Sequence, residues 1–576
     1  MGRVLMIKRY SGRLTVLFFA VVMTTLVACT STPQTEQREA LQQNASPQEQ
    51  LGTVNFPTSA RSREAQWHFL RGVAALHSFW YPVALDEFRA ATRLEPDFMM
   101  GYWGEAMTHN HPVWNDPQET EAARNVIAKI ENLPHVTPRE RAWLHATEIL
   151  YGKGDKPTRD RAYADVMENI SRDYPSDSEA ALFYALALLG TVKTGHSDAE
   201  NTRLHAADIA SRVYQDHPNH PGAAHYIIHA YDDPQHAHLA LDAAERYAKI
   251  APDAPHALHM PSHIFLQLGM WPQAAASNEA AWAASNQWVQ QRNLSLSKRD
   301  YHTLHWLMYV YLQQGRYQQA EELVMVMHQS LAHFSKDNPR DFSFGLLTHA
   351  RMISDFALQT KNWGAVESYL QEGQTEIEVA TIDMPASFNA YAAAAQIPIL
   401  YTRGMAAAMT DSVGANESLA KLDHIREQLA DSPEPFIVQE AKYIQIRVLE
   451  IEAVLDIQAY EFNKAITLMQ KATRLSETMP PPSGPPSVSK PTFELFGEIL
   501  LHADQPRKAA EQFSISLKRH PNRASTLLGL ARAAVKNRKS DEATHFYTEL
   551  LRQWSHADAL LADLQEAKQY EINTLH

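Results

Sequence analysis

Apolar residues recur along most of the chain at the three- and four-residue spacing of amphipathic helices. Ala84, Phe88 and Ala91 follow one another at intervals of four and three residues, and Ala509 and Phe513 repeat the first interval near the other end. This spacing places side chains on one face of a helix, whereas strands alternate every second residue. Glycine is scarce, with 21 among 576 residues, and the Ala-rich stretches favour helix. The pattern predicts an all-α protein.

The helical pattern has a period of 34 residues. Ala543 follows Ala509 by 34 positions, and Ala274 follows Ala240 by the same interval. A fixed period of this length is typical of solenoids, in which each helical hairpin buries its apolar face against its neighbours. The spacing of small residues, with Pro ending the second helix, resembles the tetratricopeptide repeat (TPR). The resemblance implies helical hairpins stacked in a right-handed superhelix, with a concave groove that binds partners.

Two longer strings strengthen this resemblance. HPGAAHYIIHAYDDP and APHALHMPSHIFLQLGMW resemble sequences of a group of bacterial TPR lipoproteins, and they imply no particular activity. The period is interrupted over 286–299, which has the character of an insertion.

The first 28 residues differ from the rest. A basic segment, MGRVLMIKRYSGR, precedes the apolar run LTVLFFAVVMTTLVA, which is short for a membrane span and typical of a signal peptide. The run ends in LVAC, which resembles the bacterial lipobox and implies lipidation of Cys29. Thr30 after this cysteine implies the outer membrane of a Gram-negative bacterium, facing the periplasm. The alternatives are an uncleaved N-terminal anchor and a cysteine that stands there by chance.

Cysteine usage and charge exclude several classes of function. Cys29 is the only cysteine, so intramolecular disulfides and cysteine-based zinc sites are excluded. Removal of residues 1–28, which carry four positive charges and no negative one, would change the net charge from −14 to −18. An acidic chain outside the cytoplasm is a poor candidate for nucleic-acid binding.

These observations predict six segments along the chain. They are a lipoprotein signal peptide (1–28), a polar flexible tether (29–57), a His-rich TPR domain (58–335), a helical region of degenerate repeats (336–480), a Pro-rich linker (481–490) and C-terminal TPR repeats (491–576).

Histidines occupy equivalent positions of consecutive repeats. His225 and His229 take the fifth and ninth positions of one repeat, and His259 and His263 lie 34 residues later. In the TPR family these positions face the groove. Residues four apart share one helix face, and packed helices lie about 10 Å apart. We therefore expect the four imidazoles to converge on one point, with Pro261 kinking the second helix and turning its two histidines toward the groove.

A convergent set of imidazoles is a potential metal site. Neutral imidazole binds Zn, Fe, Cu and Ni, so His225, His229, His259 and His263 are predicted to hold a divalent transition metal, whose identity the sequence does not select. The segment HYIIH lacks the glutamate of the HExxH motif, since Tyr226 stands in its place, which argues against a zinc metalloprotease.

Further groove positions carry polar side chains. His256 and His302 take the second position of their repeats and His305 takes the fifth, so all three are predicted to bind a groove ligand. Asp232 and Asp233 lie beside His229 and could act as a catalytic base.

Three functions remain open. The first is a cell-envelope binding protein whose histidine-lined groove holds a divalent metal and a peptide or small ligand. The second is a metal-dependent hydrolase or oxygenase using the same histidines. The third is a metal-free scaffold for a protein partner in the envelope. In each, the membrane is reached through the lipid on Cys29.

Overall fold

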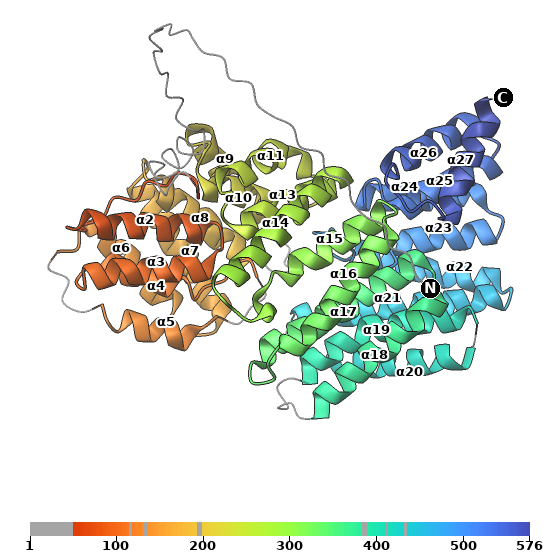
Figure 1. Ribbon diagram of the computed structural model, residues 1–576, viewed down its shortest axis with the longest axis horizontal. Helices are drawn as coiled ribbons and strands as arrows, with labels where there is room; N and C mark the ends of the chain where they lie inside the picture. Colours follow the sequence, from red (N-terminus) through yellow and green to blue (C-terminus); the bar gives the residue numbers. More distant parts are fainter. Residues whose placement is uncertain are drawn as a thin grey trace, which may run out of the picture. The chain divides into compact units, whose positions relative to one another are not determined.

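The computed structural model (Figure 1) describes residues 50–114, 118–130, 135–192, 198–382, 389–410, 412–430 and 435–575. Over these ranges the chain forms helices and no strand, so the predicted all-α fold is confirmed. No helix in the described ranges is long and apolar enough to cross a membrane. The predicted signal peptide and Cys29 lie outside the described residues.

The first half of the chain forms fourteen α-helices among the residues described: α2 (Arg63–His77), α3 (Tyr81–Leu94), α4 (Met99–Met107), α5 (Thr120–Ile127), α6 (Pro138–Leu150), α7 (Lys156–Asp173), α8 (Ser178–Thr191), α9 (Ala199–Asp216), α10 (Pro221–Ala230), α11 (Leu241–Ile250), α12 (Pro255–His259), α13 (Pro261–Gln267), α14 (Trp271–Gln291) and α15 (Tyr301–Gln313). Short 3-10 helices η1 (Ala237–Ala240), η2 (Leu296–Lys298) and η3 (Leu331–His333) join some of the elements.

The remaining helices are α16 (Tyr317–Ser330), α17 (Pro339–Thr360), α18 (Trp363–Ile382), α19 (Asn389–Ala408), α20 (Ser412–Ala430), α21 (Pro435–Gln458), α22 (Phe462–Glu477), α23 (Thr492–His502), α24 (Pro506–Arg519), α25 (Ala524–Lys536), α26 (Ser540–Gln553) and α27 (Ala562–Leu575). Most consecutive helices pack against each other as hairpins, and in Figure 1 they lie side by side along the chain.

Buried aromatic rings show why the repeat needs small residues. Phe88 on α3 is fully buried between α2 and α4. A Cβ atom at Gly72 would lie 2.7 Å from this ring, and one at Gly104 would lie 2.2 Å from it. Phe513 on α24 lies against glycines of α23 and α25 in the same way. The absence of a side chain allows each aromatic ring to fill the space between three helices.

The predicted tether ends earlier than its polar composition indicates. Leu51 and Phe56 are fully buried, and the ring of Phe56 lies 4.7 Å from that of Trp143 between centroids. The amide of Asn55 donates a hydrogen bond of 3.1 Å to Glu179 Oε1. Residues 51–57 therefore belong to the folded domain, because a few apolar side chains among the polar ones find places in its core.

The Pro-rich segment predicted as a linker packs against the histidine-rich repeats. Gln267 Nε2 donates a hydrogen bond of 2.8 Å to the carbonyl of Pro482, and a Cβ atom at Gly484 would lie 2.6 Å from the ring of Trp306. Lys490, at the end of the segment, is buried and pairs with Glu494 at 2.8 Å. Proline prevents helix formation here, but its carbonyl groups still accept hydrogen bonds.

The second half of the chain contains a buried carboxyl group. Glu450 on α21 is fully buried and accepts a hydrogen bond from the hydroxyl of Tyr401 on α19. Burial raises the pKa of Glu450 to about 7, against the lowering effect of Tyr401. The folded state therefore favours the neutral acid, since burial penalises the charged form.

Stability should depend on pH through Glu450. Because its folded pKa is raised, the favourable contribution is present below the unfolded pKa of about 4.3 and is lost as pH rises through about 7. Glu450→Gln, which imitates the neutral acid, should match the parent at about pH 4 and exceed its unfolding free energy by roughly 3 kcal/mol at about pH 8.5. Urea unfolding at both pH values measures this. Glu477→Gln, at an exposed position, is the charge-matched control. Equal differences at both pH values would contradict the assignment.

Candidate metal centre

The first helix of the second histidine repeat is divided in two. α12 ends at His259 and α13 begins at Pro261, so the predicted interruption is present. Pro261 has no N–H to continue the backbone hydrogen bonds. His259 and His263 lie on either side of the break, and their Nε2 atoms are 3.1 Å apart.

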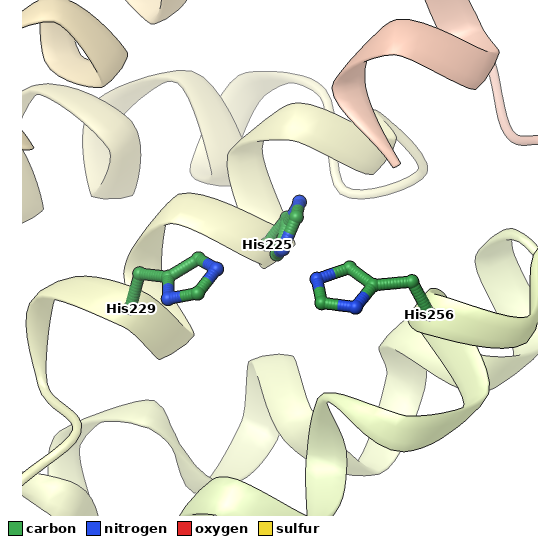
Figure 2. A group of neighbouring side chains, drawn as sticks. All are labelled: His225, His229 and His256. Atoms are coloured by element: carbon green, nitrogen blue, oxygen red, sulfur yellow. The ribbon is translucent and has the colours of Figure 1, made fainter. Parts of the chain in front are cut away.

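One group of three imidazoles forms where α10 meets α12. His225 and His229 on α10 point toward His256 on α12, as Figure 2 shows, and one nitrogen from each lies within 4.8 Å of the others. We call these residues triad A. His225 is fully buried, whereas His229 and His256 are partly exposed and line a cavity.

The nitrogens of triad A that face one another have no hydrogen-bond partner. The Nε2 atoms of His225, His229 and His256 are all buried and unpartnered. His225 Nδ1 lies 2.6 Å from the carbonyl oxygen of His77, so Nδ1 carries the proton and Nε2 is a bare lone pair. Burial and the neighbouring imidazoles lower the pKa of His229 to about 3 and the pKa values of His225 and His256 well below 6.5. All three rings are therefore neutral at pH 7.

An aromatic residue covers one side of triad A. The ring of Phe79, between α2 and α3, lies 4.4 Å from that of His225 and 5.5 Å from that of His256 between centroids. Phe79 has a φ of +52°, a left-handed conformation that is unfavourable for a bulky residue. Such conformations concentrate at functional sites.

A second group forms where α12 and α13 meet α15. One nitrogen each from His259, His263 and His302 lie within 4.8 Å of one another. We call these residues triad B. His259 and His263 are buried, and His302 is exposed. The ring of Trp306 lies 4.2 Å from that of His263 and 5.1 Å from that of His259, in a role like that of Phe79 at triad A.

The four histidines predicted as one ligand set are thus divided between two triads. His225 and His229 gather with His256, and His259 and His263 gather with His302. Each second-position histidine lies close to the fifth-position histidine of the preceding repeat: the ring centroids are 5.0 Å apart for His256 and His225, and 4.9 Å apart for His302 and His259. His256 and His302, predicted to bind a ligand, instead complete these groups.

The other predicted site residues have different surroundings. His305 Nε2 pairs with Asp355 at 2.8 Å and belongs to neither triad. Asp233 contacts Arg203 at 3.0 Å and His236 at 2.9 Å.

Asp232 is the more relevant of the two predicted aspartates. It is buried, and its Oδ2 lies 2.7 Å from His263 Nδ1. Burial alone would raise the pKa of Asp232, but His263 and the amide of Gln267 hold it below its usual value. As an anion held against a triad B ring, Asp232 orients a histidine and is poorly placed to act as a base.

The sequence did not reveal a third group, formed by His77, Glu179 and His220. All three are buried, and the Glu179 carboxylate lies 2.7 Å from His77 Nε2 and 3.0 Å from His220 Nε2. His220 Nδ1 accepts from the amide of Gly222, and His77 Nδ1 pairs with the hydroxyl of Tyr226. Every ring nitrogen of this group therefore has a partner, in contrast to triad A.

A cavity of about 1770 Å³ opens beside both triads. Its lining includes His229 and His256 of triad A, His263 and His302 of triad B, and Pro482. A metal ion in either triad would therefore have a coordination position facing a space large enough for a small ligand or peptide segment.

No protein-family model matches the chain, and no curated protein matches it. Among solved structures, it is similar to the human IFIT1 dimer with m7Gppp-AAAA, at 13% identity and a TM-score of 0.34, over 88% of this chain and 92% of that one. It is also similar to the TPR domain of P58(IPK), at 13% identity and a TM-score of 0.21, over 69% and 99%. Likenesses with TM-scores this low carry no inference about the fold or the ligands of the chain, and the architecture of helical hairpins rests on the structure itself.

Glu179 should be essential for stability but not for metal binding. Glu179→Ala would leave two buried imidazoles and the Asn55 amide without an acceptor, so the unfolding free energy should fall by about 3–5 kcal/mol. Glu179→Gln should lower the unfolding free energy by less. His77 can carry its proton on Nδ1 and donate it to the Tyr226 hydroxyl, and its Nε2 can then accept from the amide of the new glutamine. Urea unfolding measures both variants. Loss of bound metal without loss of stability would instead make this group a metal site.

Proposed function

We propose that this chain is a metal-binding helical-repeat protein in which His225, His229 and His256 hold a divalent first-row transition ion. The observation that carries the proposal is the convergence of three buried Nε2 atoms that have no partner. A buried polar atom left without a partner costs about 1–3 kcal/mol, and native proteins contain few of them. Three such atoms facing one point are best explained by a cation at that point.

The proton positions also suit a metal. His225 donates through Nδ1 to the carbonyl of His77, which directs the Nε2 lone pair toward the other two rings. Histidine ligands in metal sites are commonly oriented in this way by a carbonyl or carboxylate on the opposite nitrogen. Three imidazoles are a ligand set for Zn, Cu, Fe or Ni, and the geometry does not choose among them.

The cavity favours an anionic ligand beside the ion. Arg351, Lys518 and Arg519 line it, while three of its carboxylates are engaged by cationic groups or histidine. The engaged pairs are Asp232 with His263, Asp233 with Arg203, and Asp341 with Lys298. A small molecule or peptide with a carboxylate or similar group could bind the cationic wall and the metal together.

An enzymatic role is the second candidate. Three protein ligands with a coordination position facing a cavity are typical of catalytic rather than structural metal sites. A metal-dependent hydrolase or oxygenase would use such a position to activate water or dioxygen. Activity screens with the bound metal distinguish this role from simple ligand binding.

The proposal includes a location in the cell envelope. The basic segment, the apolar run and the LVAC sequence support a lipoprotein attached through Cys29 to the outer membrane and facing the periplasm. The histidine strings support a relationship to bacterial TPR lipoproteins. A protein or peptide of the cell envelope would then be the partner that reaches the cavity.

The direct test is metal content by inductively coupled plasma mass spectrometry, using the full chain purified without a His tag. The parent should retain near-stoichiometric metal, and His225→Ala with His256→Ala should reduce triad A to one imidazole and lose its ion. The double change His145→Ala with His545→Ala, at exposed positions, should have no effect. A parent that binds no metal after reconstitution with zinc would leave a metal-free groove for a protein partner.

A further inference from the structure

Triad B also brings one nitrogen from each of three histidines within 4.8 Å of one another, and a carboxylate lies behind one of its rings. His263 Nδ1 lies 2.7 Å from the carboxylate of Asp232, which can only accept, so the proton of His263 is on Nδ1. The Nε2 atom of His263 is therefore a bare lone pair. A carboxylate behind a metal-binding histidine is a common arrangement, since it orients the ring and raises its basicity.

The proton of His259 is placed by Asn278. Asn278 Nδ2 donates to the carbonyl of Ala274 at 3.0 Å, which directs Oδ1 toward His259 Nδ1 at 2.6 Å. Ser262 Oγ lies 3.2 Å from the same Oδ1, as a hydroxyl donor would. An amide oxygen accepts, so His259 also carries its proton on Nδ1 and presents a bare Nε2.

Two lone pairs therefore face each other at 3.1 Å in a buried place. This contact is repulsive unless a cation lies between the nitrogens. A proton on either nitrogen would also relieve the repulsion, and a count of bound ions distinguishes a proton from a metal. A metal ion needs both nitrogens unprotonated and close together, which is the arrangement observed.

We propose that His259, His263 and His302 hold a second divalent transition ion, so that the chain carries two metal sites side by side. The second site stands on its own contacts, whereas the pairing rests on the function proposed above. Each site takes two histidines four residues apart from one repeat and a third from the second position of the next repeat. The repeat has thus produced the same ligand set twice.

The two triads are neighbours along the cavity. The rings of His229 and His263 are 6.1 Å apart between centroids, as are those of His256 and His259. His302, on the exposed side, places the second ion next to the same space that His229 and His256 line. One ligand with two oxygen donors, such as a carboxylate or phosphate group, could therefore contact both ions.

The test counts ions in variants of each triad. Chelator-treated full-length chain is loaded with cobalt(II) and analysed by mass spectrometry and visible absorption. The parent should bind two ions, and one should remain both in His225→Ala with His256→Ala and in His259→Ala with His302→Ala. The exposed pair His145→Ala with His545→Ala should retain two. Circular dichroism verifies the fold of each variant.

Each other result has a distinct meaning. A parent with one ion that survives loss of His259 and His302 overturns the second site. One ion lost in both double variants indicates a single shared site and also overturns it. A parent with one ion that is retained in His225→Ala with His256→Ala, but lost in His259→Ala with His302→Ala, supports the second site and refutes the function proposed above. No ion in the parent overturns both proposals.

Two further single variants separate the two sites. His302 is exposed, so His302→Ala should fold and should weaken only one of the two ions. Asp232→Asn should weaken the same ion about 10- to 100-fold through His263 while leaving the other unchanged. If the sites are paired, copper(II) in the parent should show a broadened electron paramagnetic resonance signal, and each double variant should show that of an isolated ion. Equal weakening of both ions by Asp232→Asn would contradict the assignment of this carboxylate to triad B.

Discussion

The packing of one repeat's first helix against the first helix of the next is the constraint on which the candidate metal centre depends. α10 supplies two histidines four residues apart, and the start of α12 brings a third to them. The same relation holds between α12–α13 and α15. Because helix packing fixes the distance between these elements, the imidazoles are held in place before any ion binds. Preorganisation of this kind is what a metal site on rigid elements requires.

This arrangement is costly for the protein without metal. The Nε2 atoms of His225, His229 and His256 are buried and have no hydrogen-bond partner. At about 1–3 kcal/mol for each unsatisfied buried group, these three are a substantial fraction of the 5–15 kcal/mol by which domains are usually stable. The group around Glu179 shows that the same fold can satisfy buried histidines fully when they serve the core. The difference between these groups is the reason to assign function to the triads.

The fold was predictable because its 34-residue period reflects contacts between helices that lie close together in the sequence. The 34-residue spacing of small and aromatic residues, such as Phe88 and Phe513, reports packing between neighbours in sequence. The division of the histidines was only half predictable: the spacing identified groove positions, but it did not show that His256 of the next repeat gathers with His225 and His229. Nothing in the spacing of His77 and Glu179 could reveal their contact, because they meet only through the tertiary fold.

The hydrogen bond between Gln267 and Pro482 connects the histidine-rich repeats with the Pro-rich segment. Gln267 Nε2 also lies 3.1 Å from Asp232 Oδ1, so one amide group touches both the Pro-rich segment and the carboxylate that orients His263. Thermodynamic linkage is reciprocal. If His263 holds an ion, any change in its affinity on displacement of the segment from Gln267 would be matched by an equal change in the affinity for the displacing partner.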